Sequence, residues 1–184
     1  AVTETSTSFY NERQRVEIDL VKSLETDEAY GVGNNGEIFD VTFGLYAETD
    51  LTAADGTVIP ADGLIEIISL DENGKGTVNS DLPFGSYYVK ELSTNSAYVL
   101  NEQKYPVHFE YAGQDTAVVH LSANDSEAIE NEIIYGSVSA LKSDEDGNAL
   151  GGAVIGIFKT GTEEFTKENA IQTTTSADDG SFSF

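Results

Sequence analysis

The stretch RVEIDLVK, residues 15–22, alternates apolar and polar side chains in the manner of a half-buried β-strand. Val16, Ile18 and Leu20 share one face of such a strand, and Lys22 falls on the same face. A lysine on the core side of a strand needs an explanation, because an unpaired polar group in the interior costs several kcal/mol. The fold and the candidate site therefore both depend on what surrounds Lys22.

Seven further short alternating stretches follow, each bounded by turn residues. They are IFDVTFGLYAE (38–48), LIEIISL (64–70), GTVNS (76–80), SYYVKEL (86–92), YPVHFEY (105–111), TAVVHL (116–121) and AIENEII (128–134). Only KENAIQ, residues 167–172, suggests a helical turn. Many short strands separated by turns favour an all-β, Ig-like antiparallel β-sandwich over a parallel α/β sheet.

Two of these stretches also direct a polar residue towards the core. Glu91 shares a strand face with Val89, and Asn131 shares one with Ile129. One interpretation is a buried Lys22–Glu91 ion pair with Asn131 hydrogen-bonded beside it, an arrangement that rarely stabilises a fold by itself. The other interpretation is that the three side chains react with one another.

The reaction open to such a set is the attack of a lysine amine on an asparagine carboxamide. It gives an isopeptide amide and expels ammonia. The amine must be neutral, and burial can lower its pKa from roughly 10.4 by about 3–5 units. A carboxylic acid held between the two groups can polarise the carboxamide and move the protons. Intramolecular positioning supplies an effective concentration of about 10⁵ M or more.

An Asn and a Lys recur at one separation along the chain. Asn11 precedes Lys22 by the same interval at which Asn131 precedes Lys142 (22 − 11 = 142 − 131). After residue 134 the strand–turn–strand pattern also begins again. We interpret the chain as part of a tandem array. Residues 1–15 would be the last strand of a preceding repeat, residues 16–134 one complete repeat, and residues 135–184 the first part of the next.

The motifs resemble those of one known family. VEIDLVK (16–22), DLPFGSYYVKE (81–91) and IENEI (129–133) look like the lysine strand, the LPxGxYxxxE box and the asparagine strand of CnaB-type domains. These are the SpaA-like, prealbumin-like repeats of Gram-positive surface proteins and pilins. GSVSALKSDEDGNALGGAVIGIF (136–158) is similar to the start of such a domain.

The resemblance implies a role for each residue. Lys22 would be the nucleophile, Asn131 the acyl partner and Glu91 the catalytic acid that transfers protons. Lys142 would serve the following repeat and Asn11 the preceding one, so both would stay unreacted in this stretch.

The chain departs from the family pattern in two places. Its first strand has Glu17 and no opening Gly-x-Val, and the loop SLETDEAYGVGNNGEIF (23–39) is longer than its counterpart after Lys142. No LPxTG-type sorting signal and no YPKN-type pilin element occurs. A polymerised pilin and a single-chain adhesin therefore both remain open as the parent protein.

Composition limits the partners. The 184 residues include 33 acidic and 9 basic side chains, a formal charge of −24, which disfavours nucleic acid and anionic lipid. No apolar stretch is long enough to span a bilayer, so we expect no membrane insertion of this segment. Cysteine is absent, so no disulfide forms and any covalent link needs other chemistry. An extracellular, cell-wall location follows from the resemblance.

Other sites are not supported by the sequence. His108 and His120 alternate with apolar neighbours and should face solvent, which leaves no catalytic triad. The calcium-loop pattern at 144–155 has Ala149 at the position that requires glycine and Ile155 in place of the closing glutamate. We therefore expect no metal, no cofactor and no enzyme activity beyond a single self-modification.

Two functions remain. The first is a structural stalk repeat of a cell-surface adhesin or pilin, in contact with neighbouring repeats and stabilised by a Lys22–Asn131 isopeptide bond. The alternative is a ligand-binding adhesin module that contacts a host matrix protein or glycan. Its candidate contacts are an exposed Tyr88, the loop 23–37 and the acidic surface.

Overall fold

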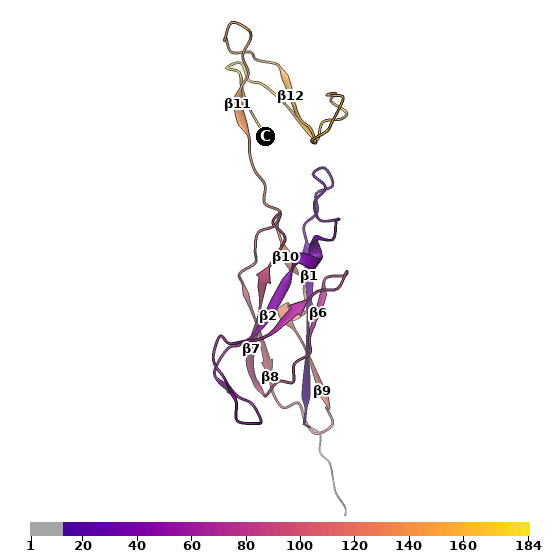
Figure 1. Ribbon diagram of the computed structural model, residues 1–184, viewed down its shortest axis with the longest axis vertical. Helices are drawn as coiled ribbons and strands as arrows, with labels where there is room; N and C mark the ends of the chain where they lie inside the picture. The colour runs from indigo at the N-terminus through magenta and orange to yellow at the C-terminus, as the bar shows by residue number, and fades with distance from the viewer. Residues whose placement is uncertain (1–12) are drawn as a thin grey trace, which may run out of the picture. The chain divides into compact units, whose positions relative to one another are not determined.

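The computed structural model describes residues 13–184. They form two compact units, each described here by itself (Figure 1). The first unit comprises the described residues up to Thr26 together with 33–133. The second comprises 134–184 together with the short segment 27–32.

The first unit is a sandwich of two sheets, as the alternating pattern predicts. One sheet contains β1 (Arg15–Leu24), β6 (Lys75–Val78), β9 (Val118–Ser122) and β10 (Ile129–Asn131). The other has the order β5-β2-β7-β8 and contains β2 (Thr42–Ala47), β5 (Leu64–Ser69), β7 (Gly85–Ser93) and β8 (Lys104–Phe109). A small hairpin of β3 (Leu51–Thr52) and β4 (Val58–Ile59) joins β2 to β5.

The core lies between the inward faces of the two sheets. Each of these faces consists of alternate residues along its strands, so the apolar side chains of the two sheets meet. The most completely buried large side chains are Tyr87, Phe43, Phe109, Ile18, Leu20, Leu45, Ile68 and Ile129. The core therefore receives side chains from the first strand, β1, and from the last, β10.

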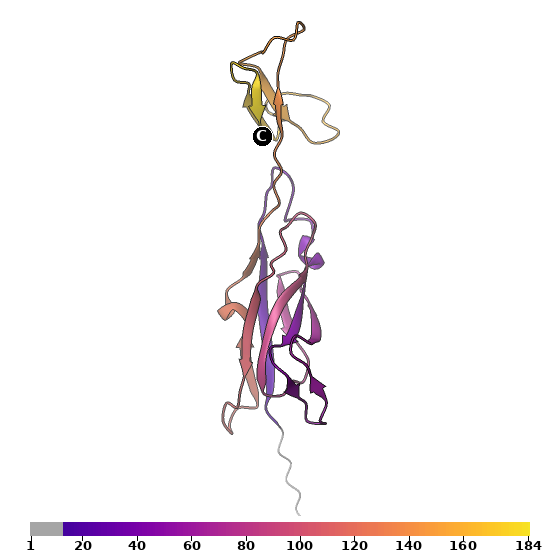
Figure 2. The same cartoon turned by 90° about the vertical axis from the view of Figure 1, so that its left-hand side faces the viewer.

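The long strand β1 organises the first sheet and is visible in both views (Figures 1 and 2). It pairs antiparallel with β6 but parallel with both β9 and β10. Asp19 of β1 lies opposite Ser122, and Lys22 lies opposite Ile129. From Asp19 to Lys22 the chain of β1 advances three residues, whereas from Ser122 at the end of β9 to Ile129 at the start of β10 it advances seven. The extra residues between β9 and β10 form a short turn.

That turn, η2 (Ala123–Ser126), has an unusual backbone. Asn124, Asp125 and Ser126 have φ angles of 57°, 52° and 70°. Asn and Asp tolerate this left-handed region better than most residues. Ala123 is fully buried and anchors the turn beneath them. The turn takes up the extra residues, so β10 continues along β1 in register.

Several predicted elements have different bounds in the structure. The stretch predicted as one strand over 38–48 begins with the 3₁₀ turn η1 (Glu37–Asp40), and only Thr42–Ala47 is a strand. The helical turn predicted at 167–172 is a single hydrogen-bonded turn over 167–169, in which Asn169 N–H donates to Thr166 O, and Gln172 already begins a strand. Alternation of side chains does not indicate which strands pair with each other, so the sequence did not predict the parallel pairing of β1 with β9 and β10.

The second unit contains β11 (Ser139–Leu141), β12 (Val154–Ile157), β13 (Gln172–Thr175) and β14 (Ser181–Ser183). The strands form two antiparallel pairs, β11 with β14 and β12 with β13. Figure 2 shows yellow β14 beside orange β11. Only Ser176 and Gly180 of residues 134–184 are buried. The described part of this unit therefore has strands but no buried hydrophobic core.

Each unit contains the same backbone contact between a lysine and a glycine. Lys22 N–H donates to Gly74 O at 2.8 Å, and Lys142 N–H donates to Gly180 O at 2.7 Å. Both glycines have positive φ, 72° and 80°. A Cβ on either would overlap the carbonyl oxygen of the lysine opposite. In each unit the glycine immediately precedes the return strand, β6 or β14, that pairs with the lysine strand.

Candidate functional site

Lys22 lies near the carboxyl end of β1 with its side chain in the core. Its parity with Val16, Ile18 and Leu20 places it there, and its side chain has no exposed area. The Nζ atom donates to the backbone oxygen of Ile129 at 2.8 Å. The same atom lies 3.6 Å from Glu91 Oε1.

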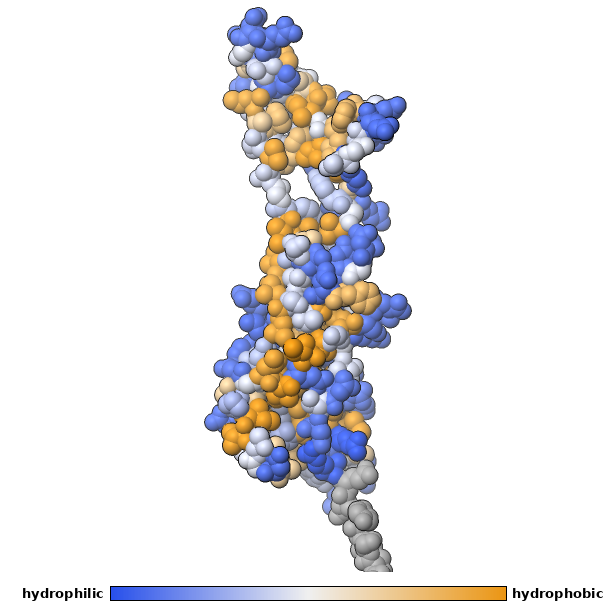
Figure 3. Space-filling model, viewed as in Figure 1, coloured by the Kyte–Doolittle hydropathy of each residue, from blue (hydrophilic) through white to orange (hydrophobic). Residues whose placement is uncertain are grey.

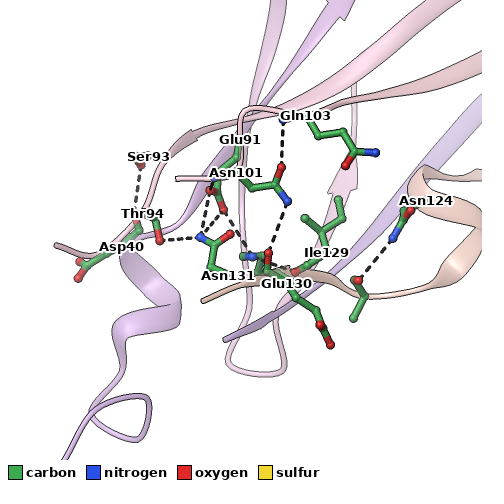
Figure 4. Close-up of polar contacts among 12 residues, drawn as sticks. Asp40, Glu91, Ser93, Thr94, Asn101, Gln103, Asn124, Ile129, Glu130 and Asn131 are labelled. Atoms are coloured by element: carbon green, nitrogen blue, oxygen red, sulfur yellow. Dashed lines mark hydrogen bonds and ion pairs between the residues drawn. The ribbon is translucent and has the colours of Figure 1, made fainter. Parts of the chain in front are cut away.

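Glu91 is the centre of the site. It lies on the inward face of β7 and is 1% exposed. Its carboxylate accepts hydrogen bonds from Asn131 Nδ2, at 3.0 Å to each oxygen, and from the backbone N–H of Asn101 at 2.7 Å (Figure 4). The carboxyl group thus lies within reach of both the amine and the amide nitrogen.

Asn131 ends β10 and is 2% exposed. Besides its contact with Glu91, its Nδ2 donates to the hydroxyl of Thr94 at 2.9 Å. Its Oδ1 is buried, and no donor among the described residues reaches it. An unsatisfied buried acceptor costs about 1–3 kcal/mol, so the reactant state of this amide is destabilised relative to a fully bonded one.

The segment after Asn131 is held from both sides. Glu25 Oε2 accepts the N–H of Ile133 at 2.8 Å, and Tyr98 Oη donates to the backbone oxygen of Glu25 at 2.8 Å. On the other side, Val99 N–H donates to Glu132 O at 2.9 Å. These contacts fix the strand on which the carboxamide is mounted.

The surroundings of Lys22 raise the fraction of its amine that is neutral. Burial lowers the pKa of Lys22 from 10.5 to about 8, partly opposed by the nearby Glu91 carboxylate. About one molecule in ten then carries a neutral amine at pH 7, against about one in three thousand for an ordinary lysine. The neutral form is the nucleophile that attack on a carboxamide requires.

The geometry also bears on the ion-pair interpretation. A strong charge-assisted hydrogen bond spans about 2.7–2.9 Å. The Lys22–Glu91 separation is 3.6 Å, and the short contact of the amine is with the neutral carbonyl of Ile129. The carboxylate instead makes its short contacts with Asn131 and Asn101. The arrangement is therefore not a tightly bonded salt bridge.

Sequence reasoning missed two residues of the site. Thr94 lies just beyond β7, where alternation no longer applies. Asn101 acts on Glu91 through its main chain, which has no residue signature. Its side chain also donates to Tyr105 Oη at 2.9 Å and to Glu130 O at 3.4 Å. Only the run of polar residues in STNSAYVLNEQ, 93–103, marked this loop.

The other predicted site residues are not brought to this centre. Lys142, in the second unit, is half-buried, and its Nζ donates to Ser143 O at 2.8 Å. Asn11 lies outside the described residues. His108 and His120 are exposed, as predicted. In residues 13–184 no cluster of metal-binding side chains occurs, and no helix is long and apolar enough to cross a membrane.

Tyr88 corrects one expectation. The sequence predicts an exposed Tyr88, whereas the side chain is buried, with an exposed fraction of 5%. Its ring stacks on Tyr46 at 5.0 Å, and its hydroxyl donates to Asp62 at 2.8 Å. The ammonium of Lys104 covers the ring at 4.1 Å from its centroid. Tyr88 does point away from the core, as its parity predicts, but neighbours on that face cover it.

The fold and the site together define a class of protein. The first unit is a two-sheet sandwich in which the first and last strands lie side by side and carry the buried Lys22 and Asn131, and Glu91 faces them from β7 of the other sheet. The SpaA family, a prealbumin-like fold domain, matches residues 16–125, and the chain belongs to this family. No curated protein sequence matches the chain significantly.

Several solved structures are similar to this chain. The Bacillus anthracis TIE protein is 17% identical with a TM-score of 0.60, over 95% of this chain and 27% of that one, and it shows the same fold. A streptococcal ancillary pilin is 20% identical with a TM-score of 0.39, over 95% of this chain and 50% of that one. The chain thus spans half or less of the length of these proteins.

Proposed function

We propose that the first unit is a structural repeat of a Gram-positive cell-surface adhesin or pilin, and that it closes itself with a Lys22–Asn131 isopeptide bond. One observation carries the proposal. Three polar side chains from three strands are 3%, 1% and 2% exposed and meet in an apolar core, with Glu91 in contact with the amide nitrogen of Asn131. A buried polar set of this kind offers little stability unless it reacts.

The reaction balances without a cofactor. The neutral Nζ of Lys22 attacks Cγ of Asn131, and a C–N bond forms. The Glu91 carboxylate takes a proton from the attacking nitrogen and delivers it to Nδ2. The Cγ–Nδ2 bond then breaks, and ammonia leaves. The products are one amide and one ammonia, and Glu91 returns to its starting state. The process is a single self-modification, so the chain is not an enzyme acting on a substrate.

The bond would close a loop that runs from Lys22 to Asn131 and includes most of the first unit. For a disulfide around a loop of about 100 residues, the chain-entropy model gives roughly 4.7 kcal/mol of stabilisation. The link would also convert the buried, titratable amine of Lys22 into a neutral amide nitrogen, while the carbonyl oxygen of Asn131 stays in place. Loss of the buried titratable amine favours the folded state of the reacted chain.

The link also determines the path of tension. β1 and β10 run parallel and side by side (Figure 1). Lys22 lies two residues before the end of β1, and Asn131 is the last residue of β10. A force that enters at Arg15 would pass along β1 to Lys22, across the bond, and out through Ile133. The 23–130 segment would bear none of it. This property suits a stalk under load.

The second unit supports the tandem interpretation. Its four strands pair as β1, β6, β2 and β5 do in the first unit, and the lysine–glycine contact is the same. The described strands of this unit include no counterparts of β7, β8, β9 and β10, which complete the two sheets around the core of the first unit. Its lack of a buried core therefore accords with a partial repeat. We propose that Lys142 belongs to this following repeat and Asn11 to a preceding one. Neighbouring repeats of the chain are then its immediate partners.

An extracellular, cell-wall location accords with this role. The chain has no cysteine, so the proposed covalent link does not depend on an oxidising compartment. The ligand-binding alternative has less support, because Tyr88, its one aromatic candidate, is buried. The face of the first unit seen in Figure 3 carries both hydrophobic and hydrophilic residues.

The test uses the purified, folded chain. Intact mass should be lower than the sequence mass by one ammonia, and peptide mapping should recover Lys22 joined to Asn131. Lys22→Ala should restore the full mass, whereas Lys104→Ala, which removes an exposed lysine, should keep the loss of ammonia. A folded wild-type chain with the full mass would contradict the proposal.

A further inference from the structure

The amide nitrogen of Asn131 is held between two acceptors. One is the carboxylate of Glu91, at 3.0 Å to both oxygens, and the other is the hydroxyl of Thr94 at 2.9 Å. Figure 4 shows Thr94 and Glu91 on different sides of this nitrogen. Under the proposed function, Nδ2 is the atom that departs as ammonia. Thr94 therefore touches the leaving group itself.

Assistance at the nitrogen matters because the carbonyl oxygen receives none. No donor among the described residues reaches Asn131 Oδ1, so the site has no preformed oxyanion hole. Expulsion of an amide nitrogen requires that the nitrogen be protonated and pyramidal. Groups that stabilise this form must contact Nδ2, and those in the described site are Glu91 and Thr94.

The hydroxyl of Thr94 suits the developing charge. In the reactant its oxygen accepts one N–H of a neutral amide. When Nδ2 takes a proton from Glu91, the same N–H belongs to a cationic nitrogen, and the hydrogen bond becomes charge-assisted and stronger. A contact that strengthens on the way to the transition state accelerates the reaction, whereas one of constant strength does not.

The backbone on both sides of Thr94 is anchored to one residue. Ser93 Oγ donates to the backbone oxygen of Asp40 at 3.0 Å, and Asn95 Nδ2 donates to the Asp40 carboxylate at 2.6 Å. Ser93 Oγ also lies 2.7 Å from Thr42 Oγ1. Thr94 is thus held in place before the reaction begins, which is the condition for an effective catalytic group.

The position of Thr94 also provides an exit. Asn131 and Glu91 are buried, whereas Thr94 is only half-buried. Ammonia released from Cγ meets the Thr94 hydroxyl, which can both accept and donate a hydrogen bond, before it reaches solvent. A buried leaving group without such a path would stay beside the new bond and favour the reverse reaction.

We propose that Thr94 is a catalytic residue of isopeptide formation, which stabilises the departing nitrogen of Asn131 on the side away from Glu91 and passes the ammonia to solvent. This inference rests on the proposed function. It adds a fourth side chain to the reaction. Glu91 delivers the proton to Nδ2, and Thr94 accepts a hydrogen bond from the protonated nitrogen.

The experiment measures the rate of ammonia loss in the full chain. The chain is made by cell-free synthesis, samples are quenched in acid at timed intervals, and intact mass gives the reacted fraction. Folding is followed in parallel by protease resistance. Thr94→Val removes the hydroxyl at nearly constant volume, and Thr94→Ser retains it. Thr77→Val is the matched control, because Thr77 is a half-buried threonine whose hydroxyl donates to Asp19. Both residues lie in the sheet opposite the one that contains β7.

We expect Thr94→Val to fold but to lose ammonia about ten- to a hundredfold more slowly than wild type, the effect of one charge-assisted hydrogen bond. Thr94→Ser and Thr77→Val should react at close to the wild-type rate. Wild-type reaction of folded Thr94→Val, or failure of Thr94→Ser to restore the rate, would overturn the role of Thr94. If Thr94→Val does not fold, Thr94→Ala decides by the same criteria. A wild-type chain that never loses ammonia would instead refute the proposed function.

Discussion

Lys22 lies opposite Ile129, and not opposite Asn131, in the parallel pair formed by β1 and β10. Asn131 is two residues further along and therefore points to the same side as Ile129. A long lysine side chain directed along the strand can cover this offset, while its amine is held by the carbonyl of Ile129 at 2.8 Å. The offset leaves room for Glu91 of the facing sheet between the two side chains.

Replacement of Glu91 by glutamine should prevent bond formation. Glutamine keeps the shape of the side chain but cannot accept and return a proton. We expect the full sequence mass in the folded Glu91→Gln chain, and a free energy of unfolding lower than wild type by roughly 4.7 kcal/mol, the contribution of the closed loop. Intact mass and urea unfolding measure the two effects.

A matched substitution separates catalysis from general damage. Glu66 is a half-buried glutamate whose carboxylate accepts the N–H groups of Asn79 and Ser80. Glu66→Gln should lower stability modestly and leave the loss of ammonia intact. Loss of ammonia in folded Glu91→Gln would mean that Glu91 does not transfer the protons.

The unreacted chain should show an unusual pH dependence of stability. Asn131→Ala cannot form the bond, so Lys22 stays free with a pKa of about 8, against 10.5 in the unfolded chain. Between these values the unfolded state binds more protons, so the free energy of unfolding should rise with pH, by roughly 3 kcal/mol in total. Urea unfolding from pH 7.5 to 10.5 measures the rise.

The control for this titration is the double variant Lys22→Met, Asn131→Ala, which lacks the amine. Its stability should change less over the same pH range, and the difference between the two chains isolates Lys22. Parallel pH profiles for the two chains would show that the amine is not buried in the way the structure describes.

Gly74 should be intolerant of any side chain. Its φ is 72°, and a Cβ there would overlap the carbonyl oxygen of Lys22. Gly74→Ala must displace the strand that carries the amine, so we expect a loss of about 2–4 kcal/mol in stability and slower bond formation.

Gly56 provides the control for this substitution. It has a similar φ of 87°, but a Cβ there would meet nothing within 4 Å. Gly56→Ala should therefore cost only about 1 kcal/mol of backbone strain. Urea unfolding of the two variants gives the comparison, and equal effects at the two glycines would contradict the contact with Lys22.

Single-molecule extension tests the path of tension. With handles at residues 13 and 133, the wild-type chain should show no extension from the segment between Lys22 and Asn131. The Glu91→Gln chain should release this segment as a length of about 370 Å at ~3.4 Å per residue. Release of that length by the wild type would show that the load does not pass through a covalent link.

Strand parity predicted where the three side chains of the site point, and the family resemblance supplied their roles. Alternation places Lys22, Glu91 and Asn131 on core faces whatever the partners of their strands, and all three are buried in the structure. Which strands pair with each other depends on the tertiary fold, so alternation could not reveal the parallel pairing of β1. Alternation also describes strands only, so it could not reveal the left-handed backbone at Asn124 and Asp125.

The sequence could not predict the roles of Thr94 and Asn101 or the burial of Tyr88. Thr94 lies past the end of its strand, and its direction is set by the anchoring of Ser93 and Asn95 to Asp40. Asn101 contributes a backbone N–H, which every residue except proline has. Tyr88 has the outward parity of an exposed residue, but contacts from other strands cover it.

The intact mass of the folded, purified chain decides whether Lys22 and Asn131 are joined. We expect a mass lower than that of the sequence by one ammonia, with Lys22 and Asn131 recovered in one branched peptide. Lys142→Arg should leave this loss unchanged, because Lys142 has no acyl partner among the described residues. A chain that is folded by circular dichroism and carries the full sequence mass would contradict the claim and leave Lys22 and Glu91 as an unreacted buried pair.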